Sequence, residues 1–155
     1  MPIQSYNLYT AKGYAGDACD NSPMVTSTGI VEAATLGFGL AVTPGSSEDH
    51  VVVGSAAGLV FGISRRELNH EAANRPSDGI TTYVATESAS ILREGFIYVE
   101  VTERAAVANV LANVVDATGA IAGGSAGAGE TASTNVRFVE GGQVGEIVKA
   151  RIDIK

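Results

Sequence analysis

Two segments of the chain alternate apolar and polar residues with a period of two. In 96–103, FIYVEVTE, the residues Ile97, Val99 and Val101 fall on one face. In 146–155, EIVKARIDIK, apolar residues alternate with charged ones up to the last position. This alternation is typical of strands with one buried and one solvated face, and a slip of one residue would exchange the faces. Both segments are therefore predicted to be strands in a fixed register.

Three further apolar runs lie in the first half of the chain, between residues that favour turns. The runs are 36–42 (LGFGLAV), 51–53 (VVV) and 59–63 (LVFGI). The turn sequence PGSSED, residues 44–49, separates the first two runs. Proline fixes its own backbone angle and glycine relaxes the next one, so the pattern predicts short strands joined by tight turns.

Only two segments show signs of a helix. Ser64 and Glu67, at the start of the polar segment 64–79, have the spacing of residues that cap one helical turn. In 104–116, RAAVANVLANVVD, five apolar residues recur at helical spacing, namely Val107, Val110, Leu111, Val114 and Val115. The two asparagines, the closely spaced valines and the nearby Gly119 fit a strand that leads into a turn instead. Helix and strand therefore both stay open for 104–116.

The first twenty residues show no sustained alternation and are predicted to form an extended arm. This segment contains Tyr6, Tyr9 and Tyr14, together with Gly13 and Gly16. A tyrosine ring can bury apolar surface while its hydroxyl still forms a hydrogen bond. The three rings have two interpretations that the sequence does not separate: they pack on the core of their own chain, or they contact a partner.

Residues 21–155 are predicted to form a single β domain. Within it, 119–134 consists almost wholly of glycine, alanine, serine and threonine, which bury too little apolar surface to offset the entropy of ordering, so a flexible loop is expected there. Several short strands with regularly spaced turns and at most one helix indicate an all-β fold. We expect a small β-barrel or sandwich with jelly-roll connectivity.

The charge and hydropathy of the chain argue against two classes of partner. The chain has 10 Lys and Arg against 17 Asp and Glu, a net charge of −7, which disfavours attraction to nucleic acid and to anionic lipid. The most apolar stretch, 51–63, is shorter than the roughly 20 residues that span a bilayer. The first residues lack a basic leader and an apolar core, so no secretory signal is expected. We predict no nucleic-acid partner and no membrane association.

The sequence offers few side chains for catalysis or metal binding. Zinc usually takes three or four Cys or His ligands, and this chain has only Cys19, His50 and His70, far apart in the sequence. The glycine-rich segment lacks the Gly-Lys-Ser or Gly-Lys-Thr of a phosphate-binding loop. Residues 17–23 (DACDNSP) fit a turn better than a calcium loop. We therefore predict no enzymatic activity, no cofactor and no metal.

Five motifs occur in an order that resembles the structural cement, or capsid decoration, proteins of tailed bacteriophages. They are 13–17 (GYAGD), 38–42 (FGLAV), 61–65 (FGISR), 90–101 (SILREGFIYVEV) and the alternating terminal strand. The resemblance spans nearly the whole chain. It departs at 108–110, where such proteins carry a glycine followed by a strand, and in the long glycine-rich loop. The resemblance favours a strand in 104–116.

The resemblance implies a role without chemistry. Such proteins are small β domains that bind the exterior of an assembled capsid and stabilise it by bridging neighbouring major capsid protein subunits. The implied location is the outer surface of the virion, after synthesis in the host cytoplasm. A homodimer or homotrimer is expected, since several weak contacts on one shell add through effective concentration. Tyr6, Tyr9, Tyr14 and Asp17 of the arm, with one exposed loop, are the candidate capsid contacts.

Two other functions compete with this one. The first is a carbohydrate-binding or receptor-binding module on the virion surface, because jelly-roll folds include lectins. The absence of Trp weakens this alternative, although five Tyr are present. The second is an enzyme on a similar fold, such as a trimeric nucleotide hydrolase, which would need an Asp-bearing motif for metal and nucleotide. No such motif fits this sequence.

Overall fold

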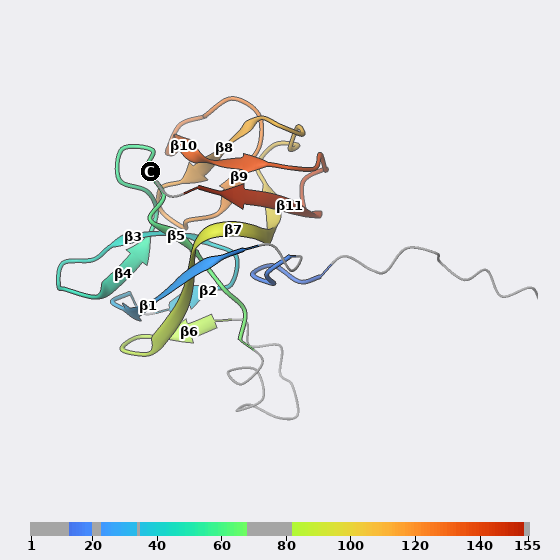
Figure 1. Ribbon diagram of the computed structural model, residues 1–155. Helices are drawn as coiled ribbons and strands as arrows, with labels where there is room; N and C mark the ends of the chain where they lie inside the picture. The colour runs from blue at the N-terminus through green and yellow to red at the C-terminus, as the bar shows by residue number, and fades with distance from the viewer. Residues whose placement is uncertain (1–12, 20–22, 34, 68–81, 154–155) are drawn as a thin grey trace, which may run out of the picture.

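One long strand, β7 (Ser88–Thr102), organises the whole fold in the computed structural model (Figure 1). The structure describes residues 13–19, 23–33, 35–67 and 82–153. In order along the chain, the other strands are β1 (Val25–Val31), β2 (Thr35–Gly37), β3 (Ala41–Pro44), β4 (His50–Val53), β5 (Gly62–Ser64), β6 (Thr82–Val84), β8 (Leu111–Val115), β9 (Ile121–Ala122), β10 (Glu130–Phe138) and β11 (Ile147–Ile152). No helix occurs in the described residues, and the predicted all-β class is confirmed.

The main sheet closes on itself twice, because β7 belongs to two circuits of strands. The first circuit runs β1-β4-β3-β5-β7 and closes by the pairing of β7 with β1. The second runs β7-β11-β10-β8-β9 and closes by the pairing of β7 with β9. The result is a small β-barrel with extra strands, and β2 pairs with β6 in a separate two-stranded sheet. A jelly roll is built from antiparallel strands, whereas β1–β4 and β7–β9 run parallel here.

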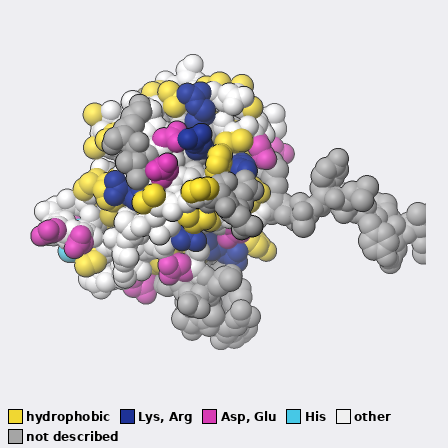
Figure 2. Space-filling model, in the orientation of Figure 1, with side chains coloured by type: hydrophobic (Ala, Val, Ile, Leu, Met, Phe, Trp, Pro, Cys, Tyr) yellow, Lys and Arg dark blue, Asp and Glu magenta, His cyan; other side chains and the backbone are white. Residues whose placement is uncertain are grey.

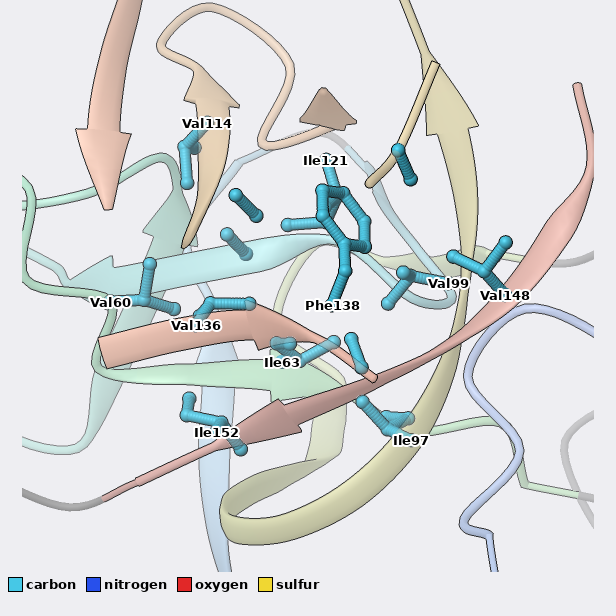
Figure 3. Packing of buried hydrophobic residues seen from close by; sticks show 14 of the residues in the cluster. Val60, Ile63, Ile97, Val99, Val114, Ile121, Val136, Phe138, Val148 and Ile152 are labelled. Atoms are coloured by element: carbon cyan, nitrogen blue, oxygen red, sulfur yellow. The ribbon is translucent and has the colours of Figure 1, made fainter. Parts of the chain in front are cut away.

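The two circuits enclose two clusters of buried hydrophobic residues, and β7 contributes to both. Ala89 and Ile91, in the first half of β7, belong to the smaller cluster, whereas Leu92 belongs to the larger one. The larger cluster also contains Ile97, Val99 and Val101 from β7, Val148, Ala150 and Ile152 from β11, and Phe138 from β10. In Figure 3 its side chains converge around Phe138. The alternation in the two segments that predicted strands therefore corresponds to one buried face on each strand.

The segment 104–116 forms a strand and not a helix. Its second half is β8, which pairs with β10 and β9. Before β8, Asn109 has a φ of 65°, which interrupts any regular helix. Val107 and Val110, which a helix would have turned toward the core, are 57% and 43% exposed. The helical interpretation is wrong because a turn around Asn109 interrupts the apolar spacing.

The predicted loop at 119–134 is shorter than expected. Strand β9 occupies two of its residues, and β10 begins at Glu130, so only 119–120 and 123–129 lie outside strands. A polar cluster holds this short connection: Arg104 forms an ion pair with Glu130 and donates from Nε to the carbonyl of Gly123 at 3.1 Å. The side-chain amide of Asn113 donates to the carbonyls of Gly123 and Gly124.

A similar correction applies to two other expectations. The run 36–42 is interrupted by a turn, since β2 ends at Gly37 and β3 begins at Ala41. Ser64 does not cap a helical turn: it is a buried residue of β5 whose hydroxyl donates to the carbonyl of Gly37 at 2.6 Å and accepts from the amide of Leu40 at 3.0 Å. Ser64 therefore fixes the turn between β2 and β3.

Candidate partner-binding surface

The described part of the predicted arm, residues 13–19, is fixed to the barrel. It continues β1 toward the N-terminus along β7, with Ala18 forming an antiparallel bridge to Ile97. The backbone amide of Gly16 donates to the carbonyl of Tyr98 at 2.8 Å, and the amide of Tyr98 donates to the carbonyl of Asp17 at 2.9 Å. This part of the arm is therefore held by strand-like hydrogen bonds, which places its side chains relative to the domain.

Two glycines allow the arm to lie close to the turn between β2 and β3. Gly16 has a φ of +87°, and a Cβ there would lie 2.8 Å from the amide nitrogen of Arg66 and 2.9 Å from Cβ of Phe38. Gly39, in the turn, has a φ of +75°, and a Cβ there would lie 3.0 Å from the amide nitrogen of Gly16. Any side chain at either position would push the arm away from the domain.

Tyr14, Asp17 and Arg66 form a cluster at the surface, which we call the arm-base cluster. The Asp17 carboxylate accepts a hydrogen bond from the amide of Tyr14 at 2.8 Å and one from Nη1 of Arg66 at 3.2 Å. The Arg66 guanidinium lies 4.2 Å from the centroid of the Tyr14 ring, within cation–π range. Tyr14 is nevertheless 68% exposed. One face of the Tyr14 ring is thus covered by the Arg66 guanidinium, and the rest of the side chain is open to solvent.

The structure brings together two of the four predicted contact residues. Tyr14 and Asp17 lie in the arm-base cluster, whereas Tyr6 and Tyr9 lie outside the described residues. Sequence reasoning missed Arg66, which comes from the segment that follows β5. The only signal for it was the Arg65–Arg66 pair at the start of the polar segment, and nothing in the sequence linked that pair to the arm.

A second group of exposed apolar side chains lies on two adjacent loops, which we call the β8 patch. It consists of Val107, Val110 and Leu111, before and at the start of β8, and Val144, before β11. The two loops are joined by a pair of hydrogen bonds between the backbones of Ala106 and Gly142, at 2.8 and 3.1 Å. This patch adjoins the turn at Asn109.

The described residues contain neither a cluster of metal-binding side chains nor a membrane-spanning helix. Among residues 13–19, 23–33, 35–67 and 82–153, no group of three or more His, Cys, Asp or Glu side chains is placed to hold a metal ion. No helix in that part of the chain is long and apolar enough to span a bilayer. Cys19 is buried. The exposed features to explain are the arm-base cluster and the β8 patch.

A family model described as "Structural cement protein (E217 gp24/Pam3 gp6)" matches residues 2–153. The chain belongs to this family. Among solved structures, the cement chain is similar to a chain from the capsid of Myoviridae phage XM1, with a TM-score of 0.70 and 16% sequence identity over 96% of this chain and 95% of that one. No curated protein matches it. The family confirms the resemblance inferred from the motifs and gives this cement protein a structural role at a phage capsid.

Proposed function

We propose that this cement protein binds the exterior of the capsid and stabilises it by bridging neighbouring major capsid protein subunits. The observation that carries the proposal is the arm-base cluster, because Tyr14 is largely exposed and yet fixed by Asp17 and Arg66. An aromatic ring held in place loses little conformational entropy on binding, and aromatic and arginine side chains are enriched among the residues that dominate interface energies.

The charge of the chain supports the outer surface as the binding site. At a net charge of −7, the protein would be repelled by packaged DNA, whereas it would meet no such repulsion outside the shell. Synthesis in the host cytoplasm is consistent with the single buried cysteine, since the fold needs no disulfide.

Bridging requires at least two contact surfaces on each cement unit. The arm, from Pro2 to Asp17, supplies the first, and the exposed loop that carries Val107 and Val110 in the β8 patch is our candidate for the second. A homodimer or homotrimer would multiply these contacts, and the resulting effective concentration turns individually weak contacts into stable attachment.

The experiment that tests the proposal is cosedimentation of the purified protein with expanded shells of the matching major capsid protein, with unexpanded shells as a control. We expect saturable binding to expanded shells and a higher shell disruption temperature. Tyr14→Ala should weaken binding about tenfold or more, a typical loss for an aromatic hot spot. Val84→Ala, which truncates an exposed apolar residue on β6, is the matched control and should bind as the unmodified protein does.

Two results would contradict the proposal. Failure to bind either kind of shell would remove the capsid-bridging function and would make the carbohydrate-binding or receptor-binding module the leading hypothesis. Binding that is unaffected both by Tyr14→Ala and by removal of residues 2–12, with the domain still folded, would show that the arm does not supply the contact.

A further inference from the structure

A groove lies where the two strand circuits meet. It consists of two adjoining pockets of about 170 and 350 Å³, which share Pro44, Phe61 and Arg93. The smaller pocket is largely apolar and includes Leu59. The larger one is lined by the middle of β1 and by the β3–β4 hairpin, where Figure 2 shows acidic side chains at one end of the molecule. The groove thus joins an apolar end to a polar one.

A β-bulge aims Arg93 into this groove. Val25 of β1 pairs with Glu94 of β7, and the next residue, Thr26, pairs with Leu92, so Arg93 is the extra residue. The Arg93 guanidinium lies 3.6 Å from the centroid of the Phe61 ring. Bulges redirect individual side chains and are frequent beside functional sites. This irregularity interrupts the longest strand of the fold at one of the three residues that both pockets share.

Two residues that line the groove each have a buried polar atom without a hydrogen-bond partner among the described residues. The atoms are Nε of Arg93 and Oγ of Ser27. In the described part of the chain, Arg93 forms no ion pair. This is notable because the whole sequence contains 17 Asp and Glu but only ten Lys and Arg. Unpaired buried polar groups are rare in native proteins and call for an explanation. Acceptors supplied by a ligand in the groove would satisfy these atoms once the side chains that cover them move aside.

We propose that the groove binds a segment of the capsid shell protein that carries a carboxylate beside an apolar side chain. This identification of the partner segment rests on the proposed function. Arginine binds carboxylates with two parallel hydrogen bonds, and Pro44, Leu59 and Phe61 offer an apolar surface for the neighbouring side chain. Glu48 and Asp49 line the larger pocket, so they would repel a doubly charged phosphate more strongly than a single carboxylate.

The carboxylate preference can be tested without shells. The probe is N-acetyl-leucine, and N-acetyl-leucinamide is its control because it keeps the apolar side chain and lacks the charge. The readout is the Nε–H resonance of Arg93 in a nitrogen-15 NMR titration. We expect a saturable shift with N-acetyl-leucine, at millimolar affinity, and little shift with the amide. An equal response to both probes would overturn the proposal, and a stronger response to inorganic phosphate would overturn the choice of a carboxylate.

Two variants localise the site. Arg93→Gln removes the cation and its contact with the Phe61 ring but breaks no hydrogen bond to the described residues. It should abolish the response to N-acetyl-leucine at the neighbouring residues of the groove. Ser27→Ala removes an unpaired hydroxyl, so it should weaken probe binding several-fold without lowering the melting temperature. Binding that survives Arg93→Gln, in a variant that is folded, would contradict the assignment.

A cosedimentation assay tests whether the groove contributes to shell binding. Arg93→Gln should weaken cosedimentation with expanded shells about tenfold or more, as expected for the loss of hydrogen bonds to a charged group. Arg151→Gln, which changes an exposed arginine of β11 that pairs with Asp153, is the matched control. If the unmodified protein does not bind shells, the proposed function fails. If it binds and Arg93→Gln binds equally well, only the groove assignment fails.

Discussion

Replacement of Asn135 by alanine should destabilise the fold more than any change of comparable size on the same strand. Asn135 is a residue of β10 that is 5% exposed. Its Oδ1 accepts from the amide of Val60 at 3.0 Å, and its Nδ2 donates to the carbonyls of Val60 at 2.8 Å and Asp153 at 3.1 Å. One side chain therefore ties the segment before β5 and the segment after β11 to β10.

The expected loss follows from these three hydrogen bonds. A neutral hydrogen bond contributes about 1 kcal/mol to stability, so Asn135→Ala should cost about 3 kcal/mol. Val60 is 2% exposed, so water has little access to its backbone groups once Asn135 is removed. Because these groups would stay unpaired, the loss of stability should not fall far below about 3 kcal/mol. For a domain of this size, 1 kcal/mol corresponds to roughly 2–4 °C, so the melting temperature should fall by about 6–12 °C.

The assay is urea unfolding together with a thermal melt, at one fixed protein concentration because self-association would add to stability. Thr134→Val is the matched control, since the Thr134 side chain is exposed and its hydroxyl forms only one hydrogen bond with the described residues, to the carbonyl of Gly58 at 3.5 Å. The control should change stability by no more than about 0.5 kcal/mol. A loss below about 1 kcal/mol for Asn135→Ala would refute the role given to this side chain.

Three further predictions concern pH and backbone conformation. Burial raises the pKa of Tyr83 from 10.0 to about 12. The stability that the buried neutral phenol contributes is therefore fully present below pH 10 and should be lost as the pH rises from 10 to 12. In a pH titration followed by tyrosinate absorbance, one tyrosine should ionise at a higher pH than the others, and Tyr83→Phe should remove this step. The hydrogen bond from the amide of Gly127 and the ion pair with Arg104 lower the pKa of Glu130 below 4.5, so stability present above pH 4.5 should be lost as the pH falls further. Glu130→Gln should show less loss in an acid melt series, and an identical loss would contradict this cause. Gly16→Ala should lower the melting temperature more than Gly129→Ala, because both have positive φ but only Gly16 meets neighbouring atoms. Equal effects would show that the close approach of the arm is unimportant.

The sequence predicted strands and their buried faces most accurately where one face of the strand is apolar and the other is polar. Ile97 and Val148 lie in segments with strict alternation, and such segments bury the apolar face whatever the connectivity. The double closure of the sheet was not predictable, since it depends on which edges of β7 remain available along its length. Nothing local to 88–102 indicates that one strand serves two circuits.

The remaining failures have a common physical cause. The sequence of 119–134 suggested a flexible loop because its residues bury little apolar surface, but Arg104 and Asn113 supply polar contacts from elsewhere in the chain. Arg66 could not be assigned to the arm for the same reason, and neither could Arg93 be assigned to a groove. Long-range polar contacts leave no periodic pattern in the sequence, so only the folded structure brings them together.

The measurement that tests the central claim most directly is a cryo-electron microscopy reconstruction of expanded shells saturated with this protein. The account predicts density for the domain on the outer surface, in contact with at least two neighbouring major capsid protein subunits, with residues 13–17 at one of the contacts. Density on the inner surface of the shell, or attachment to a single subunit, would contradict it.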